Sequence, residues 1–238
     1  MTTHIVAMGG GGFPSSEGYA ATAPGRYILS LTTKPNPLVC FVPSAAGDNG
    51  LYIQRFTNAY TRSGVTMRTA ILTLWENVAE SIDRMDEVDV SMIGGGSTVN
   101  LLALWMCTGS TASSSDMCND PDRDVVIAGL AVKRVGVPRG IDHRQLRPRR
   151  QPYPHGLGIL PGSFSPHFDR YPDRADVFKA YVDDGVLPEG YGADIGAAIH
   201  YIDGEIEAFI TEKDGAQVYW CEQAERGARL EPQQMTKI

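Results

Sequence analysis

Five short apolar runs, rich in valine, isoleucine and leucine, occur in the first half of the chain. They cover residues 4–8, 38–42, 70–74, 88–93 and 125–129. Several of them stop at glycine or proline. This pattern predicts strands that are buried on both faces of a sheet.

Helical patterns lie between and after these runs. In residues 52–60, Ile53, Phe56 and Tyr60 share one helical face, and residues 98–105 form an apolar helix start. Residues 173–182 repeat the helical spacing. Strands that alternate with helices predict right-handed crossovers and a mostly parallel sheet with helices on both faces, in an α/β protein.

The C-terminal part has a different pattern. Residues 197–202, 205–211 and 217–221 read as strands, with Asp203-Gly204 and Asp214-Gly215 as tight turns between them. This order predicts a C-terminal antiparallel meander. We find no internal repeat and no linker, so the prediction is a single domain over residues 1–238.

Charge and composition narrow the function classes. The net charge of −7 over 238 residues argues against a general nucleic-acid binder, which needs a basic surface. No signal-peptide pattern or membrane-spanning run is present, so no membrane partner is expected. The four cysteines lack a CxxC pair and predict neither a disulfide framework nor a zinc site. We therefore expect a cytoplasmic protein without a metal or other cofactor.

Ligand sites of parallel sheets lie at the carboxyl ends of the strands, where this chain has glycine clusters. They are Gly9–Gly12, Gly94–Gly96 and the region after Gly129. A single cluster is explained equally by a tight turn and by a backbone that approaches an anion. A nucleotide site at Gly9–Gly12 fits poorly, because Phe13-Pro14 follows instead of a capped helix.

Longer motifs extend over most of the chain in a recognisable order. They are Met8-Gly-Gly-Gly-Gly-Phe13, Phe41-Val-Pro-Ser-Ala-Ala-Gly-Asp48, Ile93-Gly-Gly-Gly-Ser-Thr-Val-Asn-Leu-Leu-Ala-Leu-Trp105, Gly156-Leu-Gly-Ile-Leu-Pro-Gly-Ser-Phe-Ser-Pro-His-Phe-Asp169 and Leu187-Pro-Glu-Gly-Tyr-Gly-Ala-Asp-Ile-Gly-Ala-Ala-Ile-His200. With these motifs the chain resembles the peptidase E, aspartyl dipeptidase and cyanophycinase family of serine peptidases.

The resemblance implies a fold and a chemistry. The fold is a three-layer sandwich, flavodoxin-like and similar to class I glutamine amidotransferases. The chemistry is a Ser-His-acid triad that hydrolyses a small peptide beside an acidic residue, without metal. His167 matches the base, and Gly94, Gly95 and Gly96 match part of the oxyanion hole. Ser97 stands where the family usually has Asn. The family includes monomers and dimers, so the resemblance also allows a homodimer.

The nucleophile segment departs from the family. Where the family places Ser-Ala-Gly, this chain has Ala131-Val132-Lys133, so Ala131 marks the expected serine position. The stretch that follows, to about residue 151, is Arg-rich and predicts neither a buried helix nor a core strand. The acid is also missing, and Asp142 does not align with it. Ser163 and Ser165 lie close to His167 in sequence, but neither is predicted to follow a strand on an elbow.

A change of reading frame explains these departures. The codons possible for residues 141–147, read one base later, encode Ser-Thr-Thr-Asp-Ser-Phe-Gly, which is the family's acid segment. Residues 106–118 read in another frame give Val-Tyr-Gly-Phe-Asp-Arg-Ile-Leu-Leu, which is also family-like. Sequencing error or compensating insertions and deletions would produce both stretches. The alternative is a diverged surface insertion.

Three functions follow, in order of preference. The first is a serine peptidase scaffold for small peptides, inactive or nearly so without its serine. The second is a catalytically dead binding or regulatory protein that keeps the pocket. The third is a nucleotide binder that uses Gly9–Gly12.

Overall fold

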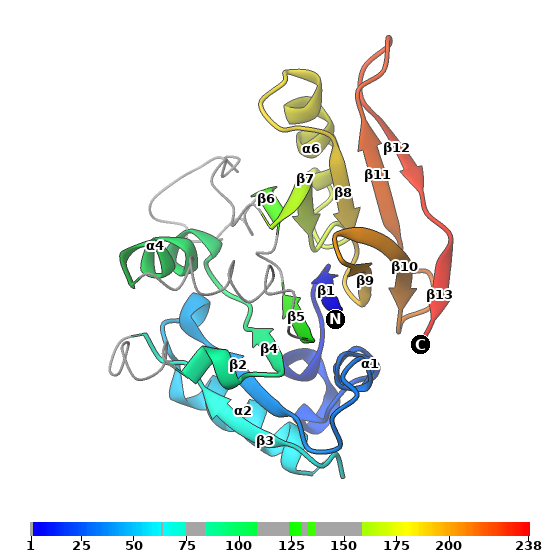
Figure 1. The fold of residues 1–238 in the computed structure, drawn as a ribbon. Helices are drawn as coiled ribbons and strands as arrows, with labels where there is room; N and C mark the ends of the chain where they lie inside the picture. The colour runs from blue at the N-terminus through cyan, green and yellow to red at the C-terminus, as the bar shows by residue number, and fades with distance from the viewer. Residues whose placement is uncertain (1, 63, 75–83, 109–123, 130–132, 137–158) are drawn as a thin grey trace.

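The chain forms two β-sheets and the helices that cover them (Figure 1). The structure is a computed structural model, and it describes all residues except 1, 63, 75–83, 109–123, 130–132 and 137–158. Everything below concerns the described residues.

The larger sheet has eight strands in the order β13-β10-β9-β1-β5-β4-β2-β3. Its strands are β1 (Thr3–Met8), β2 (Leu38–Val42), β3 (Arg68–Ile71), β4 (Val90–Ile93), β5 (Val125–Gly129), β9 (Ala197–Ile202), β10 (Glu205–Thr211) and β13 (Met235–Lys237). Strands β3, β2, β4, β5 and β1 pair in parallel, whereas β9 runs antiparallel to both β1 and β10. The mostly parallel sheet predicted from the apolar runs is confirmed.

The second sheet has five strands in the order β12-β11-β8-β7-β6. They are β6 (Lys133–Gly136), β7 (Leu160–Pro166), β8 (Gly190–Ala193), β11 (Val218–Glu222) and β12 (Arg229–Pro232). Strands β6, β7 and β8 pair in parallel, and β11 and β12 continue the sheet antiparallel.

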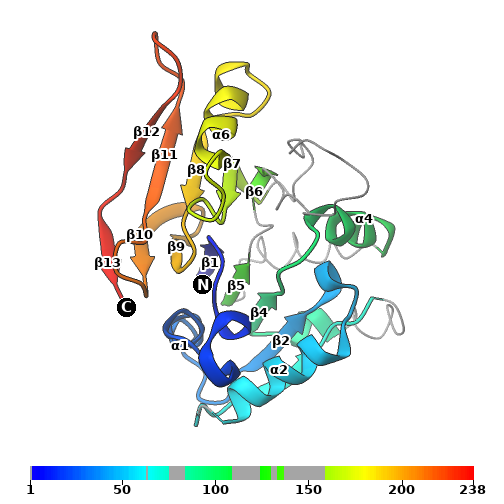
Figure 2. The same cartoon turned by 180° about the vertical axis from the view of Figure 1, so that it is seen from behind.

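One face of the larger sheet is covered by α1 (Ala23–Ser30) and α2 (Gly50–Thr61). Figure 2 shows α2 lying across β2 on this face. Side chains alternate along a strand, so Val39 and Phe41 of β2 pack against these helices. Phe56 of α2 stacks on Phe41 with ring centroids 4.4 Å apart.

The opposite face carries the alternate residues of the same strands. Leu38, Cys40 and Val42 of β2 share a core with α4 (Thr98–Thr108) and with residues of the second sheet such as Phe164. Helices on one side and α4 with the second sheet on the other make the three layers of an α/β sandwich. Helix α6 (Arg174–Asp183) packs its own small cluster against the outer side of the second sheet, around Phe178.

Most of the predicted elements are present, but two predictions differ from the structure, and α1, β7 and β8 were not predicted. The predicted strand 70–74 begins earlier, because β3 is Arg68–Ile71. The predicted meander is wrong in its third strand: β9 and β10 form a hairpin, but β11 joins the second sheet beside β8. The Arg-rich stretch was expected to form neither a buried helix nor a core strand, and its described residues form β6, an edge strand of the second sheet paired with β7.

Within the part of the chain that the structure describes, no helix is both long and apolar enough to cross a bilayer. Of the two stretches for which a change of reading frame is predicted, residues 109–118 and most of the Arg-rich stretch lie outside the described residues, whereas residues 106–108 are the end of α4.

The stacked pair Phe41 and Phe56 yields a stability prediction. Phe56 is fully buried, so Phe56→Ala should lower the free energy of unfolding by about 3–5 kcal/mol. Leu51 lies on the same helix but is 54% exposed, and Leu51→Ala should change it by no more than about 0.5 kcal/mol. Chemical denaturation of both variants measures the difference. Equal losses would contradict the packing described here.

Candidate active site

The carboxyl ends of the parallel strands surround one cavity of about 220 Å³. Its described lining comes from the ends of β1, β4 and β5, from the glycine loop after β1, from α1 and α2, and from the residue after β7. These residues are Met8, Gly10, Gly11, Gly12, Phe13, Pro14, Thr22, Gly25, Ile28, Phe41, Tyr52, Tyr60, Met92, Ile93, Gly94, Gly95, Ala128, Gly129 and His167. The site therefore lies where the parallel topology predicts it.

His167 enters this cavity from the second sheet, directly after β7. Its backbone N–H donates to the carbonyl of Gly9 at 2.6 Å, which ties the end of β7 to the end of β1. Its φ of 53° is in the left-handed region, which non-glycine residues rarely adopt. Such backbone outliers cluster at functional sites when the surroundings hold them in place. The residue is only 6% exposed.

Gly10 provides the surface on which the His167 ring lies. A Cβ atom on Gly10 would come within 2.3 Å of the ring's Cε1 and 2.5 Å of its Nδ1. Gly10 also has a φ of 122°. Only glycine permits both the ring's position and this backbone conformation.

Arg174 supports the same turn from behind. This arginine is fully buried at the start of α6, and its Nη1 donates to the carbonyl of Pro166 at 2.8 Å. Its guanidinium also lies 5.0 Å from the centroid of the Tyr171 ring. A charge-assisted hydrogen bond to the residue before His167 fixes where β7 ends. The sequence analysis missed Arg174, although its i, i+4 spacing to Phe178 places it on the buried face of the helix.

The structure brings His167 and the end of β5 into one cavity, since both His167 and Gly129 line it. Ala131, the expected nucleophile position, and Asp142 lie outside the described residues. Ser163 and Ser165 are buried within β7 and not on an elbow, and the Ser163 hydroxyl donates to the carbonyl of Pro188.

Of the three glycines after β4, Gly94 and Gly95 line the cavity and Gly96 does not, and all three are engaged with protein groups. Gly94 donates its amide to the carbonyl of Val42 at 2.8 Å, and Gly95 donates to the Tyr52 hydroxyl at 3.0 Å. A Cβ on Gly96 would lie 2.1 Å from the Ala45 carbonyl oxygen. This close backbone packing explains why position 96 is a glycine. An oxyanion hole needs N–H groups aimed at the reacting oxygen, so the assignment of these three glycines stays a prediction.

The other wall of the cavity is aromatic. Phe13 stacks on Tyr52 at 5.5 Å between ring centroids and meets Phe41 and Tyr60 edge-on at 5.8 Å and 6.2 Å. These residues belong to the core between the sheet and α2. Burial raises the pKa of the Tyr60 hydroxyl, so the wall is uncharged at neutral pH.

The segment after Gly12 is a single 3-10 turn, Phe13–Ser15, with Pro14 at its start. The expectation that no capped α-helix follows the glycine loop is confirmed. A nucleotide phosphate would therefore lack the helix N-terminus that usually binds it.

A loop after β8 packs behind the glycine loop. The Asp194 carbonyl oxygen would lie 2.2 Å from a Cβ on Gly9. The Asp194 carboxylate accepts a hydrogen bond from the Gln217 amide at 2.9 Å. Burial raises the pKa of Asp194 to about 6, and nearby Asp169 adds to the effect.

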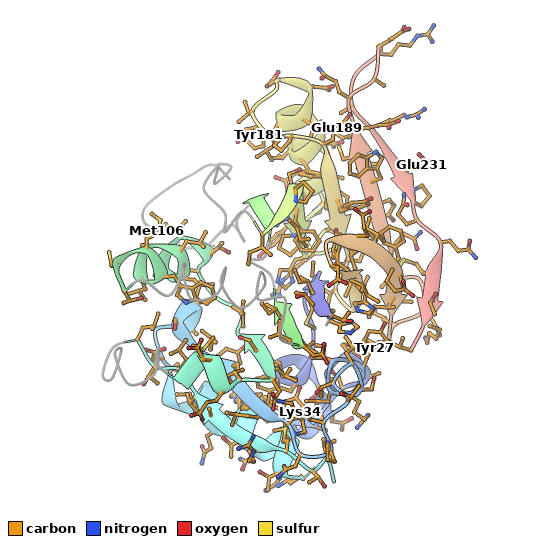
Figure 3. The ribbon with its side chains drawn as sticks, in the orientation of Figure 1. Tyr27, Lys34, Met106, Tyr181, Glu189 and Glu231 are labelled. Atoms are coloured by element: carbon orange, nitrogen blue, oxygen red, sulfur yellow. The ribbon has the colours of Figure 1, made fainter. Side chains whose placement is uncertain are left out.

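Two further histidines form a separate cluster away from the cavity lining. His4 Nδ1 lies 2.9 Å from His200 Nε2, and His200 Nδ1 lies 2.9 Å from the hydroxyl of Tyr27. Tyr27, labelled in Figure 3, comes from α1. Burial lowers the pKa of both histidines, which keeps the pair neutral. Both lie inside strands as predicted, while His143 and His155 lie outside the described residues.

No group of three or more histidine, cysteine or acidic side chains that could hold a metal ion occurs among the described residues.

Fold and cavity together define an α/β protein with a ligand-sized cavity at the carboxyl ends of its parallel strands. Residues 5–209 match peptidase family S51, and the chain belongs to this family. It is similar to the uncharacterized peptidase YgaJ of Bacillus subtilis (strain 168), with 32% identity over 225 residues that cover 93% of each chain.

Solved structures share the fold at low sequence identity. A peptidase from an acI-B1 actinobacterium superposes with a TM-score of 0.62 at 15% identity, over 99% of this chain and 95% of that one. A protein from Listeria monocytogenes EGD-e assigned as peptidase E has a TM-score of 0.56 at 14% identity, over 87% of this chain and 98% of that one. The three-layer fold inferred from the motifs is thereby confirmed.

The contact between Gly10 and His167 generates a structural prediction. Gly10→Ala should displace the His167 ring and shift its imidazole NMR resonances, because the added methyl group overlaps the ring. Gly47→Ala is a matched control: Gly47 also has a positive φ, but nothing lies within 4 Å of the added atom. Both variants should lose stability through backbone strain. If the control shifted the His167 resonances equally, the proposed contact would be wrong.

Asp194 generates a prediction on pH dependence. Its pKa is raised from 3.8 to about 6, so the folded state binds this proton more tightly than the unfolded state. The resulting stability is complete below about pH 3.8 and is lost as the pH rises through about 6. Asp194→Asn removes this titration and keeps an acceptor for Gln217. Denaturation at each pH measures the free energy of unfolding of the native chain and of the variant. Between about pH 3.8 and 6 this free energy should fall more in the native chain than in the variant. If the two free energies changed in parallel with pH, the prediction would be contradicted.

Proposed function

We propose that the chain is a serine-type peptidase scaffold for small peptides whose turnover is absent or nearly so, because Ala131 stands where the nucleophile is expected. The observation that carries the proposal is the shared cavity: His167 and Gly129, two residues before Ala131, line the same space. Membership of peptidase family S51 supports the hydrolytic chemistry.

In the proposed mechanism of an intact relative, the serine hydroxyl after β5 attacks the peptide carbonyl carbon. His167 accepts the hydroxyl proton and then donates it to the leaving amine. Water next attacks the acyl-enzyme, and His167 accepts its proton. His167 then returns this proton to the serine oxygen as the acyl group leaves as a carboxylic acid. Two observations favour this role for His167. Its backbone N–H donates a hydrogen bond to Gly9, and its ring packs against Gly10, so that the ring is held at the edge of the sheet.

A second candidate is a binding or regulatory protein that keeps the pocket and lacks turnover. The observation that favours it is the cavity wall itself. Phe13, Tyr52 and Tyr60 belong to the hydrophobic core and come from parts of the chain far from position 131. Both candidates take a small peptide as ligand, and we propose a cytoplasmic setting for both.

The test compares the chain as it is with a restored protein. The restored protein carries Ala131→Ser and the family's reading of the Arg-rich stretch, including Ser-Thr-Thr-Asp-Ser-Phe-Gly for residues 141–147. Dipeptides with acidic, basic and apolar first residues serve as substrates. We expect hydrolysis by the restored protein alone, and His167→Ala in that protein should lower kcat by at least about 10³-fold.

The matched control in the restored protein is His4→Ala, which removes a histidine outside the cavity lining and should keep kcat within about twofold. A folded restored protein without activity on any dipeptide would refute the peptidase scaffold. Peptide binding without turnover, by the restored and the native chain alike, would favour the second candidate.

A further inference from the structure

The cavity beside His167 has an apolar and aromatic interior. Beyond the glycine loop, it is walled by Phe13, Tyr52, Tyr60, Ile28 and Met92, from the loop after β1, from both helices and from β4. Ile28 and Met92 are 2% and 7% exposed, so the wall is part of the packed core. A wall of this composition gains free energy by covering apolar surface of a ligand.

Charge is the second observation. Among the described residues that line the cavity, none is Asp, Glu, Lys or Arg. The Glu212 carboxylate lies beside the glycine loop, since its Oε1 would be 3.5 Å from a Cβ on Gly11. Arg26, on the exposed side of α1, acts on Tyr60 and Glu212 but does not line the cavity. Within the described lining, an acidic ligand side chain would lose its hydration without gaining a cationic partner.

Size is the third observation. A cavity of about 220 Å³ holds about seven water molecules at about 30 Å³ each. A space of this size can hold a side chain of the size of leucine or phenylalanine. The space therefore suits one substrate side chain and not a longer peptide segment.

We propose that this cavity is the specificity pocket of the site and that it takes a neutral, apolar substrate side chain of leucine to phenylalanine size. The inference rests on the proposed peptidase function, because His167 and Gly129, between which the reaction is proposed to occur, line the same space. It departs from the acidic preference that the resemblance suggested.

Binding to the chain as it is provides the test, because binding does not require the nucleophile. Isothermal titration calorimetry at pH 7 compares Leu-Ala, Phe-Ala and Asp-Ala. We expect Leu-Ala or Phe-Ala to bind at least about tenfold more tightly than Asp-Ala. Tighter binding of Asp-Ala, or no binding of any of the three, would overturn the proposal.

Two neighbouring residues provide matched variants. Ile28 lines the cavity, whereas Leu29, also buried in α1, does not. Ile28→Ala enlarges the pocket and should shift the preference from Leu-Ala toward Phe-Ala and Trp-Ala by about tenfold. Leu29→Ala removes the same number of atoms from the core and should leave the preference unchanged. Equal shifts in both variants would refute the assignment of the pocket.

The restored protein separates this inference from the proposed function. If it cleaves Asp-Ala faster than Leu-Ala and Phe-Ala, the function stands and the pocket assignment fails. If it cleaves nothing while the native chain still prefers the apolar dipeptides, the pocket assignment stands and the peptidase function fails.

Discussion

The site depends on one contact between the two sheets, in which the end of β7 meets the glycine loop after β1. His167 donates its backbone N–H to Gly9 and lays its ring on Gly10. The Asp194 backbone, which follows β8, approaches Gly9 from the same sheet. A side chain on either glycine would collide with one of these segments, so the two sheets can meet only if both positions are glycine.

This contact explains why the second sheet matters for the chemistry. The parallel strands of the larger sheet supply glycine-terminated ends but no base among the described residues at the cavity. The proposed base, His167, directly follows β7, which is aligned by its pairing with β8 and by the hydrogen bond from Arg174 to Pro166. A buried arginine left without that carbonyl would be costly, so the arginine and the turn stabilise each other.

The parts predicted well from the sequence are the strands of the larger sheet. Strands β2 and β5 are continuous apolar runs because both of their faces are buried, and the printed bounds agree with the pattern. Strands β7 and β8 were missed, since Leu160–Pro166 and Gly190–Ala193 are rich in glycine, serine and proline. Gly190 packs against Ser163 so closely that no Cβ fits, a constraint that a propensity pattern cannot express.

Helix α1 was missed for a related reason. It contains Pro24 and Gly25, which weaken a helical pattern. Proline is tolerated in the first turn, and a Cβ on Gly25 would lie 2.5 Å from the Tyr60 hydroxyl.

The resemblance identified His167 as a site residue. The contact of its ring with Gly10 could not be predicted, because the two residues are far apart in the sequence. In the proposed function, side-chain recognition and bond cleavage would be supplied by different parts of the chain. The pocket wall is built before residue 96, in core positions whose packing the fold itself requires, whereas the base and the end of β5 come later. Replacement of the serine therefore removes the reacting atom without removing a wall residue, and a chain that has lost turnover can keep its selectivity for a ligand.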